Sequence, residues 1–498
     1  MPRTFEIVFM ASEMVPYCKT GGLADVIGAL PEELARQGNN VTVIIPYYRE
    51  VAEWAEKNKS VPPIVVDALP FFLPGYTQTA CVRKIDDPSG MNILFIDYPS
   101  AFDREELYTE GGQDYEDNLT RYAIFCKAGI EACKALAIRP DILHANDWQA
   151  AMAPVYLKTH YGQDPFFENT SSILTIHNLG YQGRFSGDKF QGLDLPWELF
   201  NPEGLEYFGQ VNILKGGIIF ADSVTTVSPT YAKEIQTPEF GAGMDGLLAS
   251  RSDKLVGILN GVDYSDWNPN TDKLIPVKYS KDNLDGKWQC RTQLRKEVGL
   301  PDCKAPLIGM ISRLAEQKGF EILLKALPRL MKLNLQIVIL GTGDPRYHTE
   351  LGKAAEKYPD KLAIKLTFSN ELAHQIEAGC DMFLMPSRYE PCGLNQMYSL
   401  RYGTVPIVSS TGGLKDTVEN VTPARLKKGS ATGFVMKAFS EGSLYSTVKK
   451  AVQLFSEDKK NWRKLIEASM SKDFGWTTQA RQYTKLYSEL SKEAAAVS

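Results

Sequence analysis

Short runs of apolar residues alternate along this chain with longer segments in which apolar residues recur at helical spacing. The short runs are typical of buried strands and the longer ones of amphipathic helices. Such alternation indicates strand–helix units built around a parallel sheet. In the first half, the predicted strands are Glu6–Met10, Val41–Ile45, Met91–Ile96, Asp141–His144, Ser172–His177 and Ser223–Val227. In the second half, they are Leu307–Ile311, Leu335–Leu340, Ala363–Leu366, Met382–Met385 and Val405–Val408.

A stretch rich in Asn, Asp, Lys and Pro, from Asn260 to Asp302, separates the two sets of strands. A chain of 498 residues is also too long for one ordinary hydrophobic core. We therefore expect two doubly wound α/β domains, residues 1–264 and 265–476. The helical pattern of residues 477–498 has no strand after it, and we expect this last helix to pack back across the domain junction.

Composition narrows the class of protein. Hydrophobic residues make up 44% of the chain and charged residues 23%, as in soluble globular proteins. The net charge of -5, without a basic block that carries interleaved aromatics, gives no support for a nucleic-acid partner. The first ten residues lack the features of a secretory signal, and no apolar stretch reaches membrane length. We expect no membrane partner and a cytoplasmic, bacterial protein, although a processed plastid protein fits the same observations.

The eight cysteines are scattered, without a C-x-x-C pair or a histidine at zinc spacing. This pattern predicts reduced thiols and no metal site. Cys18 beside Lys19 and Cys392 near Glu390 fit reactive thiols if their surroundings are electropositive. The ordinary use of cysteine as a small buried or tolerated side chain is the favoured interpretation of both.

In an open parallel sheet, ligands bind at the carboxyl ends of the strands. Polar residues and glycines recur at these ends in both halves of the chain. The first half has Lys19-Thr20-Gly21-Gly22, Asn146-Asp147-Trp148 and His177-Asn178. The second half has Arg313 with Lys318-Gly319, then Gly341-Thr342-Gly343, Ser387-Arg388-Tyr389-Glu390 and Thr411-Gly412-Gly413.

Several of these features suit a diphosphate. Adjacent glycines before a helix, as at Gly21-Gly22 and Gly412-Gly413, let backbone amides approach an anion. Arg313 can donate two hydrogen bonds to phosphate oxygens, and Lys318 adds a compact charge. Taken alone, Gly21-Gly22 fits a simple turn with a solvated Lys19, and Arg313 and Lys318 fit a surface pair. Their recurrence in both halves favours anion binding.

The two carboxylates Asp147 and Glu390 raise the possibility of a glycosidase. That mechanism gives no use to the diphosphate features, whereas glycosyl transfer from a nucleotide sugar uses both sets. No P-loop, G-x-S-x-G or H-E-x-x-H motif is present, which excludes readings based on those motifs.

A series of motifs then extends in order from Ile7 to Asp473-Phe474-Gly475-Trp476. They are Lys19-Thr20-Gly21-Gly22-Leu23-Ala24-Asp25-Val26, Asn146-Asp147-Trp148, His177-Asn178-Leu179, Asn260-Gly261-Val262-Asp263, Ser312-Arg313-Leu314, Gln317-Lys318-Gly319, Glu390-Pro391-Cys392-Gly393-Leu394 and Thr411-Gly412-Gly413-Leu414. Together they closely resemble the bacterial glycogen synthase and plant starch synthase family, glycosyltransferase family 5.

The resemblance implies a GT-B fold, in which two Rossmann-like domains with doubly wound parallel sheets face a deep cleft. It implies retaining transfer of glucose from ADP-glucose to the non-reducing end of an α-1,4-glucan, with no cofactor and no metal. The catalytic residues carried over from the family are Glu390, Arg313, Lys318, His177 and Asp147. The substrate-binding residues carried over are Lys19, Gly21, Gly22, Asn260, Phe368, Cys392, Gly393, Leu394, Thr411, Gly412 and Gly413.

The resemblance also implies individual roles. Arg313 and Lys318 would hold the diphosphate, and Glu390 would bind hydroxyls of the donor sugar. His177 would lie close to that sugar, and Asp147 would serve the donor sugar and the incoming acceptor. Further roles are a phosphate contact for Lys19, Gly21 and Gly22, a sugar contact for Asn260 and stacking on the base for Phe368.

Some positions depart from the commonest family pattern. Asn146 and Gln149 stand where many bacterial members have histidines, and Phe240 stands where a tyrosine is usual. Tyr398 stands where related retaining families have a second glutamate, as is typical of this family. Three alternatives stay open from the residues: a related transferase that uses UDP-glucose or another acceptor, a glucan-binding protein without turnover, and a phosphorylase-like enzyme. The oligomeric state is open as well.

Overall fold

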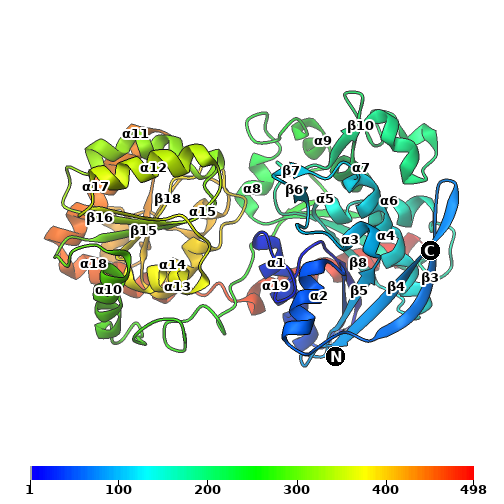
Figure 1. The fold of residues 1–498 in the computed structure, drawn as a ribbon, viewed down its shortest axis with the longest axis horizontal. Coiled ribbons are helices and arrows are strands. Elements are labelled where there is room, and N and C mark those ends of the chain that lie inside the picture. Colours follow the sequence, from blue (N-terminus) through cyan, green and yellow to red (C-terminus); the bar gives the residue numbers. More distant parts are fainter. Residues whose placement is uncertain (1–2, 498) are drawn as a thin grey trace. The chain divides into compact units, whose positions relative to one another are not determined.

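The computed structural model of this protein describes residues 3–497 (Figure 1). The chain forms two compact units. The first unit comprises Met1–Val227, Ala232–Gly261 and Trp476–Ser498, and the second comprises Ser228–Tyr231 and Val262–Gly475. The chain therefore enters the second unit briefly at Ser228–Tyr231, passes into it again after Gly261 and returns to the first unit at Trp476.

The first unit is built on a nine-stranded sheet with the order β14-β13-β9-β8-β1-β2-β5-β4-β3. Its strands are β1 (Glu6–Met10), β2 (Asn40–Pro46), β3 (Ile64–Leu73), β4 (Tyr76–Asp86), β5 (Asn92–Asp97), β8 (Ile142–Asn146), β9 (Ser171–Ile176), β13 (Ser223–Thr226) and β14 (Leu255–Gly257). From β5 to β14 every neighbouring pair is parallel, whereas β4 pairs antiparallel with both β5 and β3. The predicted parallel sheet is confirmed, with an antiparallel hairpin added at one edge.

The second unit is built on a six-stranded sheet that is parallel throughout, with the order β17-β16-β15-β18-β19-β20. Its strands are β15 (Leu307–Ile311), β16 (Gln336–Leu340), β17 (Leu362–Lys365), β18 (Met382–Met385), β19 (Val405–Val408) and β20 (Phe434–Val435). Numbered within the unit, this is the order 3-2-1-4-5-6 of the doubly wound nucleotide-binding fold. The parallel part of the first sheet begins in the same order.

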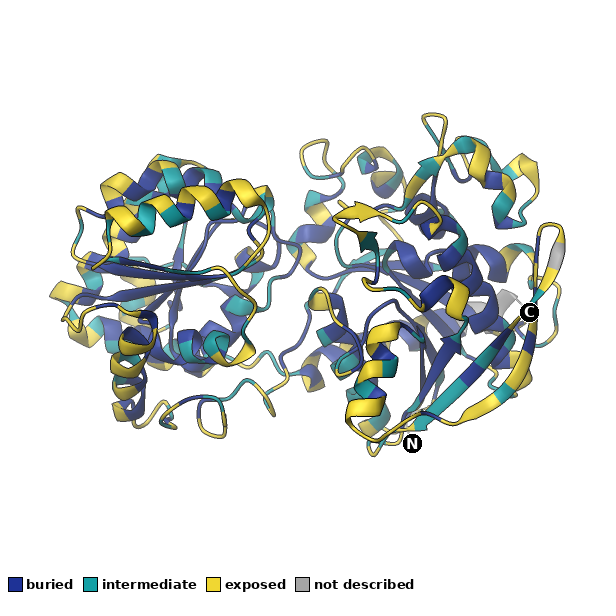
Figure 2. Cartoon of the chain, in the orientation of Figure 1, coloured by how far each residue is buried: buried dark blue, intermediate teal, exposed yellow. Residues whose placement is uncertain are grey.

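Helices cover both sheets, and Figure 2 shows their exposed outer faces beside buried strands. In the first unit the longer helices are α1 (Gly22–Arg36), α2 (Arg49–Lys57), α4 (Asn118–Ala135), α6 (Met152–Thr159), α7 (Ile213–Phe220) and α19 (Trp476–Val497). In the second they are α10 (Asp285–Val298), α11 (Phe320–Leu330), α12 (Pro345–Lys357), α13 (Asn370–Gly379), α14 (Asn395–Tyr402), α17 (Glu441–Glu457) and α18 (Lys459–Met470). Among the described residues, no helix has the length and apolarity needed to cross a membrane.

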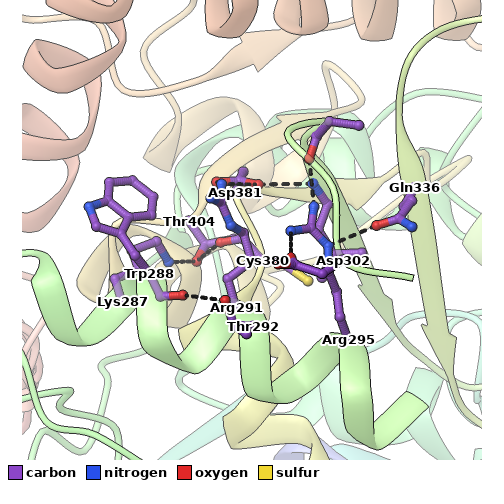
Figure 3. A network of polar contacts seen from close by, with 12 residues as sticks. Lys287, Trp288, Arg291, Thr292, Arg295, Asp302, Gln336, Cys380, Asp381 and Thr404 are labelled. Carbon is purple, nitrogen blue, oxygen red and sulfur yellow. Dashed lines mark hydrogen bonds and ion pairs between the residues drawn. The ribbon is translucent and has the colours of Figure 1, made fainter. Parts of the chain in front are cut away.

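Helix α10 is fixed to the second unit by long basic side chains. Figure 3 shows Lys287, Arg291 and Arg295 on this helix, with partners on neighbouring segments. Arg295 donates to Gln336 on β16 at 2.8 Å, and Arg291 donates to Asp381 at 3.0 Å. Asp381 also accepts from the backbone amide of Leu307 at 2.9 Å, so it links α10 to the start of β15. The buried Arg295 and Asp381 thus have hydrogen-bond partners, and their contacts fix the strand that leads into the candidate site.

The last helix, α19, packs on the first unit. Tyr487 is fully buried, and its hydroxyl lies 3.0 Å from Nδ1 of His144 on β8. His144 Nε2 lies 2.6 Å from the hydroxyl of Thr175 on β9. At the beginning of α19, Trp476 fills the space beside Gly261, where an added Cβ would lie 2.5 Å from its ring. The terminal helix therefore completes the core of the first unit.

Candidate active site

In each unit, several of the candidate residues follow the two strands at which the strand order reverses. In the first unit these strands are β1 and β8, and in the second they are β15 and β18. Helices leave the sheet in opposite directions there, which creates a crevice at the carboxyl ends of the strands. The motifs after β1, β8, β15 and β18 therefore lie at the ligand-binding end of each sheet.

In the second unit, Lys318 and Glu390 form one ion pair. The Lys318 Nζ donates to Glu390 Oε1 at 2.9 Å and to Oε2 at 2.8 Å. Ser387 Oγ donates to the same Oε2 at 2.9 Å. Glu390 is only 6% exposed, so these hydrogen bonds replace the water that its carboxylate loses on burial. The carboxylate is thereby held in one orientation at the end of β18.

Two glycines permit the close backbone approaches around this pair. Gly319 has φ +76°, and a Cβ there would lie 2.0 Å from the carbonyl oxygen of Pro386. Gly412 has φ +43°, and a Cβ there would lie 1.9 Å from the carbonyl oxygen of Glu390. A side chain at Gly319 would push its loop away from Pro386, and a side chain at Gly412 would push its loop away from Glu390.

The expectation of free amides at Gly412-Gly413 does not hold at Gly413. Its N–H donates to the carbonyl oxygens of Glu390 at 3.2 Å and Pro391 at 3.1 Å. A Cβ at Gly413 would lie 2.1 Å from the carbonyl oxygen of Cys392. This glycine therefore fixes the segment that follows Glu390. The amide of Gly413 is used inside the protein and is not offered to an anion.

Gln396 and Asn395, which the sequence did not single out, hold the loop that carries Cys392, Gly393 and Leu394. Gln396 is fully buried and donates to the carbonyl oxygens of Cys392 and Gly393, both at 3.0 Å. Asn395 donates to the carbonyl oxygen of Ile311 at the end of β15 at 2.8 Å. The only sequence signal for these roles is an amide side chain at the start of helix α14, directly after the site loop.

Arg313 and Phe368 have exposed side chains. Arg313 follows β15, and Phe368, which is 79% exposed, follows β17. The backbone of the Arg313 loop is fixed by the glycine turn after β16, because the amide of Leu314 donates to the carbonyl oxygen of Thr342 at 2.8 Å. Gly341-Thr342-Gly343 therefore supports the loop that carries Arg313.

In the first unit, the structure brings Asp147, His177 and Asn146 together. The backbone amide of His177 donates to Asp147 Oδ1 at 2.7 Å. The His177 ring lies with Nε2 3.0 Å from Asn146 Oδ1, and Asn146 is 2% exposed. Asp147 adopts φ +56°, a left-handed conformation that is unusual for a residue other than glycine. Backbone strain of this kind is concentrated at functional sites.

Burial shifts the ionisation of both Asp147 and His177. Burial raises the pKa of Asp147 to about 7, against the amides of His177 and Asn178, which lower it, while the charge of Glu13 raises it further. Burial lowers the pKa of His177 to about 3. At neutral pH the imidazole is therefore uncharged, and the carboxyl is divided between its two protonation states.

Lys19 pairs with an acidic residue of its own motif. Its Nζ lies 2.6 Å from Asp25 Oδ1 in the first turn of α1. The Lys19 side chain is 41% exposed. The pair is thus an exposed one, whose contribution to stability is small and which another anion can replace.

The glycine turn also surrounds a carboxylate that was not predicted from the sequence. Glu13 is 4% exposed and accepts from the backbone amides of Thr20 at 2.5 Å and Gly21 at 3.0 Å. The expectation that the Gly21 amide is free for a phosphate is therefore wrong for this structure. The signal in the sequence is slight: a single acidic residue in the Ala11-Ser12-Glu13 segment, directly after a buried strand.

Asn260 lies near the end of the Ala232–Gly261 segment of the first unit and is 6% exposed. Its side-chain oxygen is buried, and within the described part of the chain no hydrogen-bond partner is found for it. A buried acceptor without a partner is uncommon in folded proteins. The sugar contact that the family resemblance implies for Asn260 stays a prediction; it would give this oxygen a hydrogen-bond donor.

The predicted residues are divided between the two units. The first unit holds Lys19, Gly21, Gly22, Asp147, His177 and Asn260, and the second holds Arg313, Lys318, Phe368, Glu390, Cys392, Gly393, Leu394, Thr411, Gly412 and Gly413. Cys18 is 1% exposed and Cys392 is 4% exposed, which favours the buried-thiol interpretation of both. Among residues 3–497, no group of three or more His, Cys, Asp or Glu side chains is arranged to hold a metal ion.

Both units are Rossmann-like and built on parallel strands, and each has cations, amides and carboxylates where its strand order reverses. These features define a two-domain glycosyltransferase of GT-B type. The family model "Starch synthase catalytic domain" matches residues 6–250, and "Glycosyl transferases group 1" matches residues 291–469. The chain belongs to the glycogen synthase and starch synthase family.

Similar proteins extend over nearly the whole chain. A glycogen synthase of Koribacter versatilis is 47% identical over 98% of this chain and 99% of its own length. A glycogen synthase of Thermotoga maritima is 43% identical over 97% of this chain and 98% of its own length. The catalytic domain of starch synthase IV from Arabidopsis thaliana, bound to ADP and acarbose, is 32% identical with a TM-score of 0.88, covering 98% of this chain and 100% of that one.

Proposed function

We propose that this enzyme elongates an α-1,4-glucan at its non-reducing end with glucose from ADP-glucose, retaining the configuration of the anomeric carbon. The observation that carries the proposal is the Lys318–Glu390 ion pair where the strand order of the second sheet reverses, with Arg313 on the same loop as Lys318. This arrangement offers two cations for a leaving diphosphate and an oriented carboxylate for a sugar. Relatives named glycogen synthase, which match nearly end to end, support the choice of acceptor.

We assign the donor to the second unit. Arg313 and Lys318 bind the diphosphate and stabilise the charge that it gains as the glycosidic bond breaks. Glu390 binds hydroxyls of the donor sugar, and the exposed ring of Phe368 stacks on the base. ADP as the nucleotide is supported by its presence in the starch synthase IV structure.

We assign contacts to the transferred sugar and to the acceptor to residues of the first unit. The uncharged imidazole of His177 suits a position beside a sugar that gains positive charge in the transition state. Asp147, held by backbone amides, accepts hydrogen bonds from sugar hydroxyls. Lys19 and Gly22 bind the donor phosphates. We further propose a cytoplasmic location in a bacterium, because the relatives named glycogen synthase are bacterial proteins.

Donor choice is tested by titrating the purified enzyme with ADP and, separately, with UDP in a calorimeter. We expect ADP to bind at least about tenfold more tightly, a difference of about 1.4 kcal/mol in binding free energy. Lys318→Ala should weaken ADP binding, whereas Lys325→Ala, an exposed lysine on α11, should not. Equal binding of UDP would favour the alternative of a UDP-glucose transferase, and no binding of either nucleotide would contradict the assignment of the donor site.

A further inference from the structure

We propose that Glu13 is a positioning residue for the glycine turn of the first unit: its carboxylate fixes the backbone of Thr20 and Gly21. This inference rests on the proposed function, because that turn is where the donor phosphates are to bind. Glu13 itself touches no substrate in this proposal. It acts through the turn, by deciding where Lys19 and the amide of Gly22 are held.

Four hydrogen bonds converge on this one carboxylate. Oε2 accepts from the amides of Thr20 at 2.5 Å and Gly21 at 3.0 Å. Oε1 accepts from the Thr20 hydroxyl at 2.6 Å and from the Tyr108 hydroxyl at 2.6 Å. All four donors are uncharged, and hydrogen bonds to an ionised acceptor are stronger than those between neutral groups. With Glu13 only 4% exposed, the turn is held firmly from its inner side.

Some backbone amides of the turn bond within the protein, and another is left to bind a ligand. Successive backbone N–H groups at a glycine turn form a natural site for an anion. Here the protein's own carboxylate takes the amides of Thr20 and Gly21. Binding of a phosphate at this turn therefore falls to the amide of Gly22 and the ammonium of Lys19.

The glycine at position 21 independently indicates that a substrate approaches this turn. Its φ of -151° and ψ of -168° are open to any residue, so the backbone does not require glycine there. A Cβ built at Gly21 would meet no heavy atom of the described residues within 4 Å. Neither conformation nor internal packing thus explains a glycine at this position. Close approach of a substrate to the outer side of the turn does explain it.

Tyr108 connects this arrangement to the rest of the first unit. Its hydroxyl lies 2.7 Å from Ser12 Oγ, besides donating to Glu13. Its ring packs against Tyr122 on α4, and Tyr122 packs edge-on against Trp148 at a centroid distance of 5.0 Å. Trp148 is the neighbour of Asp147. Through Tyr108, Glu13 therefore connects the glycine turn to Tyr122 and Trp148, which pack beside the Asp147 segment.

The test begins with Glu13→Gln, which keeps the size of the side chain but replaces one acceptor oxygen with a donor. We expect the backbone amides of residues 19–22 to exchange hydrogen faster in this variant. We expect kcat/KM for ADP-glucose to fall about 30-fold, the scale of losing one or two charge-assisted hydrogen bonds. Glu131→Gln is the matched control, because Glu131 likewise accepts from a tyrosine hydroxyl, that of Tyr161 at 2.6 Å. It should change neither quantity.

Two further variants separate positioning from a general loss of stability. Thr20→Val removes the hydroxyl that donates to the same carboxylate. If the two residues act together, the double variant should lose less kcat/KM than the product of the two single fold losses, by about threefold or more. Gly21→Ala should leave hydrogen exchange of the turn unchanged while lowering kcat/KM for ADP-glucose, because its added methyl lies where the substrate approaches.

The outcomes distinguish this inference from the proposed function. Unchanged exchange at residues 19–22 together with unchanged kcat/KM in Glu13→Gln would overturn the role of Glu13 and leave the transferase function intact. If the wild-type enzyme transfers no glucose at all, the proposed function fails, while the exchange measurement still reports whether Glu13 holds the turn. If Glu13→Gln does not fold, Thr20→Val carries the test, and native exchange with native kcat/KM in that variant overturns the inference.

Discussion

Lys318 and Glu390 lie 72 residues apart in sequence, yet the Nζ of Lys318 donates to both carboxylate oxygens of Glu390, at 2.9 and 2.8 Å. The pair joins the loop after β15 to the loop after β18, where the strand order of the second sheet reverses. Each charge therefore keeps the other in place before any substrate arrives. Preorganised charges of this kind stabilise a transition state without reorganising during the reaction.

Removing either charge of the pair should abolish most of the turnover. We expect Lys318→Ala and Glu390→Ala each to lower kcat at least about a hundredfold, the scale of deleting one preorganised charge stabiliser. Steady-state kinetics with ADP-glucose and glycogen measure this directly. Lys325→Ala serves as the control for a lost surface charge. A tenfold or smaller loss in both site variants would show that the pair is structural rather than catalytic.

The rate should depend on the ionisation of Asp147. Because its pKa is raised to about 7, the fraction of ionised carboxylate increases from pH 6 to pH 8. If the ionised form is the one that accepts from sugar hydroxyls, kcat/KM rises through this range and levels off above it. The diphosphate of ADP-glucose has no group that titrates there. Asp147→Asn should abolish this rise of kcat/KM between pH 6 and pH 8. An unchanged rise in that variant would assign the titration to another group.

Stability should decrease in mild acid because of His144. Burial, with a smaller effect of His177, lowers the pKa of His144 to about 3, so the folded state keeps this imidazole neutral. The unfolded chain, with an ordinary histidine pKa near 6.5, binds the extra proton below that pH. The free energy of unfolding therefore falls as pH falls, by about 1.4 kcal/mol per pH unit for this residue between pH 6 and pH 4.

The pH dependence of unfolding in wild type and His144→Gln measures that contribution. The variant is expected to be less stable at neutral pH, since it loses the contacts with Tyr487 and Thr175. Its free energy of unfolding should nevertheless change less steeply with pH than that of wild type. Equal slopes would mean that His144 is already accessible to protons in the folded protein.

Thiol chemistry should single out one cysteine. Cys303 is exposed, whereas Cys18, Cys126, Cys133, Cys290, Cys380 and Cys392 are buried and Cys81 is intermediate. Burial also raises the pKa of Cys133 to about 12, and raises the pKa of Cys18 and Cys126 as well, which keeps these thiols protonated. A thiol reagent should label Cys303 first in the native enzyme, and Cys303→Ser should remove the fast phase. Fast labelling of Cys392 would show that the loop after Glu390 opens readily.

Eleven parallel strands were predicted to within one or two residues, because helices cover both faces of the sheet and the strands are continuous apolar runs. The short parallel strands β14 and β20 at the sheet edges were missed. The antiparallel hairpin of β3 and β4 was missed for the opposite reason. Strand β3 is at the edge of its sheet, so it tolerates Asp67 and Pro70 among its apolar residues. That composition does not resemble a buried strand.

Site residues were predictable where a functional side chain comes after a strand. Contacts that depend on how a loop folds back were not predictable. The sequence placed Lys318 and Glu390 at the ends of two strands, and the topology of the sheet brings these ends together. Nothing in the sequence indicates that Gly413 donates to the carbonyl oxygen of Glu390, or that Glu13 takes the amide of Gly21. Such contacts arise from the path of the loops, and no local pattern encodes them.

The most direct test of the central claim is to incubate the purified enzyme with glucose-labelled ADP-glucose and glycogen, and then to identify the linkage of the label in the precipitated polymer. The proposed function predicts label at non-reducing ends in α-1,4 linkage, at a rate that falls at least about a hundredfold in Glu390→Ala. Absence of label from ADP-glucose, or label in a β linkage, would contradict it.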